Sequence, residues 1–170
     1  MMKKILSLIL FSVIAVTTLF SCGRPEDGYE VGDACYEYTL DKITSSGTDN
    51  IKNHRGKPVI IHFWGTWCDE LSPFDKIAVD YKGEVTVLAI HSDHERGKAK
   101  EYIEEKYMDS EIIFLYDEPD GHNEDKYYAL LGGTDTYPRT LILDKEGIVT
   151  LVKDGAMDYE ELLAEVERIK

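Results

Sequence analysis

An apolar strand, followed by a cysteine-bearing turn and a helix start, constrains the fold of this chain more than any other feature. Residues 59–63 are Val-Ile-Ile-His-Phe, a run with β-branched residues that is typical of a buried strand. Ser72 and Pro73 suit the start of a helix, with Ser at the cap and Pro at the first position. Cys68 lies between them. The sequence therefore predicts a thiol at the junction of a buried strand and a helix.

The residue three positions after Cys68 decides what this thiol can do alone. In a Cys-x-x-Cys dithiol site, one thiolate attacks a disulfide and the second thiol resolves the mixed disulfide. Here position 71 is Leu. The unpaired N–H groups and dipole of a helix N-terminus stabilise a thiolate, whereas the carboxylates of Asp69 and Glu70 disfavour a second negative charge. The sequence locates a candidate site and leaves its turnover open.

The N-terminal segment has the layout of an export signal. A basic start, Met-Met-Lys-Lys, precedes an apolar run over residues 5–20, as in secretory signal peptides. Leu-Phe-Ser-Cys, ending at Cys22, resembles the lipobox of bacterial lipoproteins, in which the cysteine carries lipid after cleavage. An ordinary cleaved signal with an incidental cysteine is the alternative. We expect a signal peptide over 1–21, lipid on Cys22, a tether over 22–31 and one domain over 32–170.

The chain is strongly acidic. It has 33 Asp and Glu against 19 Lys and Arg, a net charge of −14, and loss of residues 1–21 would remove two lysines and no acid, giving about −16. Such a surface repels nucleic acid and anionic lipid headgroups. We therefore expect no nucleic-acid partner, and membrane attachment only through lipid on Cys22. With 170 residues and 43% hydrophobic residues, the chain can form one globular domain.

Strand and helix patterns alternate along the domain. Strands are expected over 36–40, 59–63, 85–90, 112–116, 140–143 and 148–152, helices over 72–82, 94–107, 123–131 and 158–170, and a loop over 44–53. This alternation predicts a mostly parallel sheet covered on both faces. The turn at 144–147 adds a terminal antiparallel hairpin.

Two segments carry a family resemblance. Residues 56–69 resemble the TlpA-like thiol-disulfide oxidoreductases of the thioredoxin superfamily, which have a Gly-Lys-Pro turn, an apolar strand and Phe-Trp-x-x-Trp-Cys. The matching residues here are Gly56, Lys57, Pro58, Phe63, Trp64, Trp67 and Cys68. Residues 136–147 match the family's cis-proline loop, the following strand and Asp-x-x-Gly. The resemblance implies a thioredoxin-like α/β fold, with a central mixed β-sheet, helices on both faces and an N-terminal β extension.

The resemblance also implies how the site is arranged. In the family fold the cysteine turn faces the cis-proline loop, and the proline packs beside the nucleophilic sulfur. We therefore expect Pro138 to be cis, which is uncommon, with Tyr137 or Thr136 offering backbone hydrogen bonds to an extended substrate. The implied substrate-binding residues are Trp67, Thr136, Tyr137 and Pro138. The implied partners are protein thiols and disulfides in the cell envelope, on the periplasmic side or at the outer membrane, and no cofactor is implied.

Three interpretations of Cys68 remain open. It works as a monothiol whose mixed disulfide is resolved by an external thiol, or Cys35 replaces the missing partner, or the domain is a redox-inactive module that binds or scaffolds a partner. Cys35 lies in Ala-Cys-Tyr, where relatives often have Ala-Pro before an aromatic residue. A disulfide needs Cα atoms less than about 7 Å apart, and the sequence alone does not place Cys35. Thiol-disulfide exchange is the leading interpretation.

A peroxiredoxin-like peroxidase is a weaker alternative. That family uses Pro-x-x-x-Thr-x-x-Cys, but counting back from Cys68 places Gly65 at the Thr position and Ile61 at the Pro position. Thr66 is one residue out of register. The pattern therefore disfavours peroxidase activity.

The remaining polar motifs are interpreted as structural. His91-Ser92-Asp93-His94 could bind a metal or shuttle protons, but a metal site needs three or four converging ligands. A loop that caps the next helix through Asp93 is the simpler interpretation. His62 is expected to be a core histidine, Tyr127 and Tyr128 are expected to be half-buried, and no metal site is predicted.

Overall fold

The computed structural model describes residues 25–68, 70–92, 95–118, 126–134 and 136–170. The expected signal peptide and Cys22 lie outside these residues. The strands are β1 Asp27–Gly28, β2 Ala34–Cys35, β3 Thr39–Lys42, β4 Thr48–Asn50, β5 Val59–Trp64, β6 Thr86–His91, β7 Ile113–Tyr116, β8 Arg139–Leu143 and β9 Val149–Asp154. The helices are the 3-10 helix η1 Ile51–His54 and the α-helices α1 Ser72–Asp80, α2 Arg96–Lys106, α3 Lys126–Leu130 and α4 Tyr159–Ile169.

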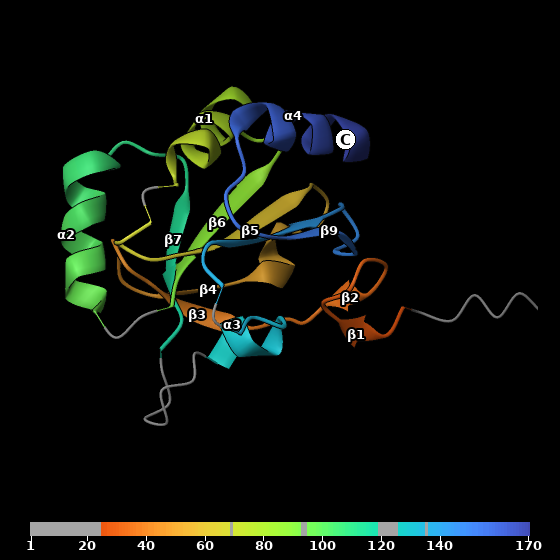
Figure 1. The fold of residues 1–170 in the computed structure, drawn as a ribbon, viewed down its shortest axis with the longest axis horizontal. Coiled ribbons are helices and arrows are strands. Elements are labelled where there is room, and N and C mark those ends of the chain that lie inside the picture. Colours follow the sequence, from red (N-terminus) through yellow and green to blue (C-terminus); the bar gives the residue numbers. More distant parts are fainter. Residues whose placement is uncertain (1–24, 69, 93–94, 119–125, 135) are drawn as a thin grey trace, which may run out of the picture.

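Seven of the strands form one mixed sheet, in the order β4-β3-β7-β6-β5-β8-β9 (Figure 1). Among the described strands of this sheet, the parallel pairs are β5 with β6 and β6 with β7. The other neighbours in the sheet are antiparallel. The mixed sheet is confirmed, but the expectation of a mostly parallel one is wrong, because antiparallel strands extend it on both sides.

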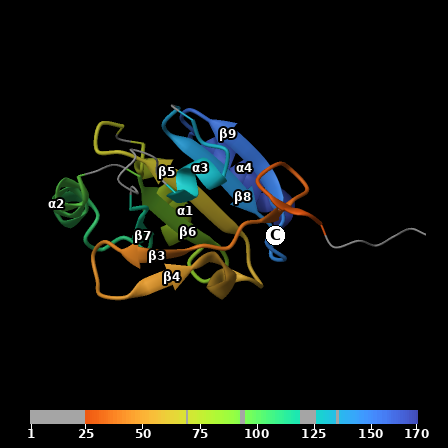
Figure 2. The same ribbon diagram turned by 90° about the horizontal axis from the view of Figure 1, so that it is seen from below.

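Helices cover both faces of the sheet, as expected. Helices α1, α2 and α4 pack on one face around a cluster that we call the α1 core, which includes Ile60, Trp64, Leu71, Phe74, Ile77, Ala99, Ile103, Leu162 and Val166. Helix α3 lies across the other face (Figure 2). It packs on a second cluster, the α3 core, which includes Cys35, Ile61, Phe63, Tyr127, Tyr128 and Leu141. Because side chains alternate along a strand, β5 supplies residues to both cores.

The region before β5 differs most from the expectation. Strand β3 begins at Thr39, so residues 36–38 lie outside it. The expected loop over 44–53 contains the short edge strand β4 and the helix η1. Asn50 caps η1 by accepting a hydrogen bond from the Lys52 N–H. Asn and Asp favour turns, so the sequence does not reveal this three-residue strand, which pairs with β3 at the edge of the described sheet.

The start of the domain is tied to the terminal hairpin. Asp27–Gly28, within the segment expected to be a tether, pair in parallel with Ala34–Cys35. The N–H of Gly32 donates to the Val149 carbonyl at 2.9 Å, and the N–H of Cys35 donates to the Gly147 carbonyl at 3.0 Å. These bonds hold Cys35 at the α3 core.

None of the described helices is long and apolar enough to cross a bilayer.

Candidate functional site

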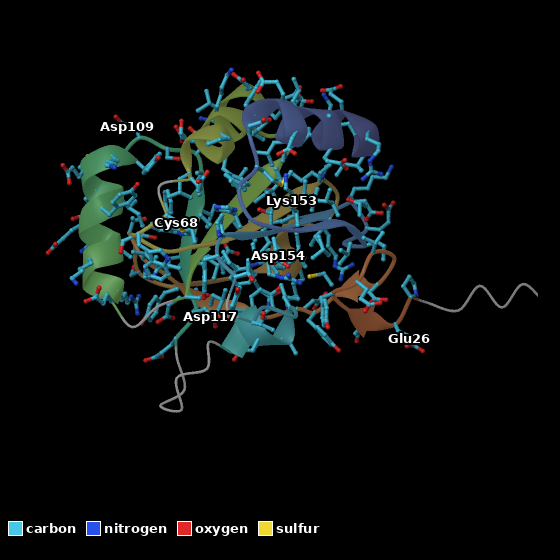
Figure 3. The ribbon with its side chains drawn as sticks, viewed as in Figure 1. Glu26, Cys68, Asp109, Asp117, Lys153 and Asp154 are labelled. Atoms are coloured by element: carbon cyan, nitrogen blue, oxygen red, sulfur yellow. The ribbon has the colours of Figure 1, made fainter. Side chains whose placement is uncertain are left out.

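Cys68 lies in the connection from β5 to α1 (Figure 3). Its N–H donates to the Gly65 carbonyl at 3.0 Å, which closes a turn over residues 65–68. The N–H of Gly65 in return donates to the Cys68 sulfur at 3.2 Å. The Trp67 ring folds back over Gly65, where a Cβ would lie 2.4 Å from the ring, so a larger residue at this position would displace Trp67. The turn thus holds a partly exposed sulfur against a backbone N–H donor.

Helix α1 begins too far along the chain for the Cys68 thiol to lie at its N-terminus. Its N-cap is Leu71, in a helical conformation, and Ser72 is the first helical residue, so the expected Ser72 cap is wrong. Cys68 therefore precedes the helix by four residues, and the influence of a helix dipole is confined to the terminal turn. In the described part of the chain, the N–H of Gly65 is a hydrogen-bond donor to the sulfur. Asp69 lies outside the described residues.

The cis-proline loop lies at the same edge of the sheet. The Tyr137–Pro138 peptide bond is cis, as expected. Strands β5 and β8 run antiparallel with Phe63 opposite Arg139. The turn after β5 and the loop before β8 must therefore meet, although Cys68 and Tyr137 are 69 positions apart in sequence.

The turn and the loop touch through two aromatic rings. Trp67 is 61% exposed, and its ring meets the Tyr137 ring edge-on with centroids 5.6 Å apart. The Tyr137 hydroxyl donates to the Ser92 carbonyl at 3.0 Å. Of the two residues expected to offer backbone groups to a substrate, Thr136 has its carbonyl already bonded to the Tyr128 hydroxyl at 2.6 Å.

Cys35 is placed elsewhere. Its side chain is 3% exposed and belongs to the α3 core, whereas Cys68 packs against the α1 core on the other face of β5. The Tyr127 hydroxyl lies 3.8 Å from the Cys35 sulfur. Burial raises the pKa of the Cys35 thiol to about 11. Within the described residues, neither Cys35 nor Cys68 forms a disulfide.

His62 is a buried core residue, as expected. It lies on β5, stacks on Phe74 of α1 at 3.8 Å, and its Nδ1 lies 2.9 Å from the Thr140 hydroxyl. Its Nε2 has no hydrogen-bond partner among the described residues. Burial lowers the pKa of His62 to about 3, so the ring is neutral at neutral pH. It is a structural link between β5, α1 and β8.

His91 and Ser92 are buried where β6 ends, and Asp93 and His94 lie outside the described residues. The His91 ring meets the Trp64 ring edge-on at 5.0 Å. In the part of the chain that the structure describes, no three His, Cys, Asp or Glu side chains gather as metal ligands.

The hydrogen bonds between Asp117 and helix α3 were not predicted from the sequence. Asp117, at the end of β7, accepts hydrogen bonds from the N–H groups of Tyr127 and Tyr128 at 2.7–2.9 Å (Figure 3). Tyr127 and Tyr128 are fully buried rather than half-buried. An Asp between a strand and a helix commonly caps that helix. Here Asp117 caps a helix ten residues further along the chain, and a sequence pattern of a few residues does not predict a cap at that distance.

Comparison with known proteins finds relatives that match along nearly the whole chain. No family model matches the chain. It is 27% identical over 171 residues to the thioredoxin-like protein YneN of Bacillus subtilis, covering 95% of this chain and 96% of that protein. It is 22% identical over 176 residues to the thiol-disulfide oxidoreductase ResA of Geobacillus thermodenitrificans, covering 99% and 95%.

Solved structures share the fold. The exposed lipoprotein thioredoxin Etrx1 of Streptococcus pneumoniae superposes with a TM-score of 0.64 at 22% identity, over 78% of this chain and 99% of that one. A DsbF homologue of Corynebacterium diphtheriae superposes with a TM-score of 0.69 at 22% identity, over 87% and 95%. The fold is thioredoxin-like.

Proposed function

Because this chain is a thioredoxin-superfamily protein similar to YneN and ResA, we propose that it exchanges thiols and disulfides through Cys68. The observation that carries the proposal is the placement of this sulfur. It is partly exposed, accepts the Gly65 N–H, and lies in a turn whose Trp67 contacts the cis-proline loop. A nucleophilic thiol needs such access and such donors.

The exchange proceeds in two steps that each break one disulfide and form one. The Cys68 thiolate attacks a partner disulfide, forms a mixed disulfide and releases one partner thiolate. A second, external thiolate then attacks the partner sulfur of that mixed disulfide. It forms a new disulfide with the partner and releases the Cys68 thiolate. Electrons balance without a cofactor, and Cys68 ends as it began.

The resolving thiol comes from outside the chain in this proposal. Leu71 occupies the position of a second active-site thiol and is fully buried. Cys35 is an unsuitable replacement, because it is buried in the core on the other face of β5 and its raised pKa, about 11, keeps it protonated near neutral pH. Monothiol exchange therefore fits this site better than resolution by Cys35.

The proposal includes export and lipid anchoring. The similarity to Etrx1, which is described as an exposed lipoprotein, supports an extracytoplasmic location. Together with the N-terminal pattern, it supports a signal peptide over 1–21, lipid on Cys22 and a short connection to the domain. Metabolic labelling with an alkyne fatty acid tests this. Label is expected on the wild-type chain and absent from Cys22→Ser; equal labelling of both would contradict the assignment.

A turnover assay tests the exchange activity. The full-length Cys22→Ser chain is mixed with a peptide disulfide and an external thiol, and release of the peptide thiol is followed. We expect catalysis that is lost in Cys68→Ser and kept in Cys35→Ala. Catalysis that survives Cys68→Ser would refute the role of Cys68. Loss of catalysis in a folded Cys35→Ala chain would show that Cys35 is the resolving thiol.

A redox-inactive binding module is the second candidate, favoured by Leu71. The full burial of Leu71 in the α1 core makes position 71 a packing position, and Trp67, four residues earlier in the chain, is exposed. A binding module would retain its partner after Cys68→Ser and lose it after Trp67→Ala. The exchange proposal instead expects capture of the partner as a disulfide that Cys68→Ser abolishes.

A further inference from the structure

Two stacked tyrosines hold the cis-proline loop. The Tyr128 ring lies against the Tyr137 ring, with centroids 4.5 Å apart and planes at 22°. The Tyr128 hydroxyl donates to the Thr136 carbonyl at 2.6 Å. The Tyr137 hydroxyl donates to the Ser92 carbonyl at 3.0 Å. The loop before β8 is thus tied to α3 and to the end of β6.

Tyr128 is itself fixed on several sides. Its side chain is 3% exposed, and its N–H donates to the Asp117 carboxylate at 2.7 Å. Gly133 lies so close to the ring that a Cβ there would be 2.5 Å from it. The Phe63 ring of β5 meets it edge-on at 5.1 Å. A ring held this firmly can position the loop that it touches.

The hydrogen bond to Thr136 has a consequence for substrate binding. The Tyr128 hydroxyl occupies one lone pair of the Thr136 carbonyl and so fixes the orientation of the peptide that links Thr136 to Tyr137, whose backbone is the expected partner of an extended peptide. The orientation of that backbone depends on the stack and on the Thr136 bond. We propose that Tyr128 is a positioning residue that adapts the Cys68 site to peptide disulfides rather than to small disulfides. This inference rests on the proposed exchange function.

The two kinds of disulfide separate the role of the loop from the role of the sulfur. A small disulfide such as bis(2-hydroxyethyl) disulfide needs only access to the Cys68 sulfur. A disulfide within an extended peptide also needs backbone hydrogen bonds from the loop. Loss of the Tyr128 hydroxyl therefore affects the peptide reaction selectively. A general loss of structure affects both reactions.

Tyr128→Phe is the test, with Tyr127→Phe as its matched control. The two residues are neighbours on α3, both are buried, and each change removes one hydroxyl. The Tyr127 hydroxyl, however, donates to the Tyr36 carbonyl at 2.9 Å, away from the loop. Rate constants of reduced Cys68 with both disulfides are measured on full-length chains carrying Cys22→Ser. Urea unfolding verifies that each variant is folded.

We expect the ratio of peptide rate to small-disulfide rate to fall about three- to tenfold in Tyr128→Phe, the size of one neutral hydrogen bond. The ratio is expected to be unchanged in Tyr127→Phe. An equal loss with both disulfides, or no loss with either, would overturn the positioning role. Absence of reaction between wild-type Cys68 and the small disulfide would instead refute the exchange function and the inference with it.

Gly133→Ala tests the contact between the Tyr128 ring and the cis-proline loop by displacing the ring. The added Cβ must displace the Tyr128 ring, because the overlap is with a rigid ring rather than a flexible chain end. The same selective loss of the peptide reaction is expected. If the ratio stays at its wild-type value in a folded Gly133→Ala chain, the ring position does not matter and the inference is wrong.

Discussion

At the scale of single residues, the site has one thiol where a dithiol site has two. Cys68 is partly exposed, and Leu71 is buried against the α1 core with Phe74 and Ile77. A Leu side chain at this position packs in the core, whereas a cysteine there would supply a resolving thiol. The choice of Leu stabilises the start of α1 and removes internal resolution. The mixed disulfide on Cys68 is therefore expected to persist until an external thiol arrives.

Leu71→Cys is predicted to restore internal resolution. The spacing to Cys68 is that of a dithiol site, so a mixed disulfide with glutathione is expected to convert to an internal disulfide that intact mass measurement detects. The smaller side chain is expected to cost ~1–3 kcal/mol of unfolding free energy in the reduced form. The same change combined with Cys68→Ser is the control. A stable glutathione adduct on Cys68 in Leu71→Cys would show that position 71 cannot reach it.

At the scale of elements, β5 organises the molecule. Its odd-numbered residues enter the α3 core and its even-numbered residues the α1 core. It pairs with β6 on one side and with β8 on the other. The strand therefore delivers the cysteine turn to the loop that precedes β8. His62 adds a polar link across this layer, because it contacts both Phe74 and Thr140.

His62 is predicted to make the fold sensitive to acid. Burial lowers its pKa to about 3, against 6.5 in a model peptide. Between these values the unfolded chain binds a proton that the folded chain does not. Stability is therefore lost as the pH falls from about 6.5 towards about 3, and this contribution is constant above about pH 7. Urea unfolding across this range measures it.

His62→Asn is the matched variant, because Asn keeps a polar group for Thr140 and does not titrate. Its unfolding free energy is expected to fall less steeply with acid than that of the wild-type chain. Identical slopes for the two chains would mean that His62 does not carry the acid sensitivity.

The elements were predictable where the hydrophobic pattern is strong. The expected strands over 59–63 and 85–90 match β5 and β6 within one residue at their ends, because buried β-branched runs are distinctive. The helix expected over 158–170 matches α4 within one residue at each end, and the structure adds a capping box between Asp158 and Glu161. Strand β4 was missed, because its polar residues are held by pairing with β3 rather than by their own preferences.

The candidate site was predictable only in part. The Trp67–Cys68 turn and the cis peptide at Pro138 followed from the family resemblance. The tyrosine and aspartate contacts around the loop did not, because Asp117, Tyr128 and Thr136 meet only after three elements have packed. The separation of Cys35 from Cys68 also depends on which face of the sheet each one joins. No local sequence pattern predicts which face of the sheet each cysteine joins.

At the scale of the whole molecule, charge is the dominant feature. From a net charge of −14 and from Glu70, two residues after Cys68, we expect a negative potential around the partly exposed sulfur. Such a potential attracts cations and repels anions over distances near the Debye length. Partners with basic residues beside their cysteines are therefore expected to react faster than acidic ones.

Charged disulfides are predicted to reveal this preference. The rate of Cys68 with cationic cystamine is compared with its rate with anionic glutathione disulfide, each divided by the rate of a neutral model thiol. We expect the normalised ratio to favour cystamine by about tenfold at low salt and to shrink as salt is added. Glu70→Gln is expected to lower it. A ratio near one that does not change with salt concentration would exclude electrostatic selection between the two disulfides.

The most direct test of the central claim is to identify which thiol reacts. The full-length Cys22→Ser chain, whose remaining thiols are Cys35 and Cys68, is incubated with glutathione disulfide near neutral pH, quenched with acid and analysed by intact mass and peptide mapping. The account predicts one glutathione on Cys68, removed by added thiol, with Cys35 unmodified. An unmodified chain, or a disulfide between Cys35 and Cys68, would contradict it.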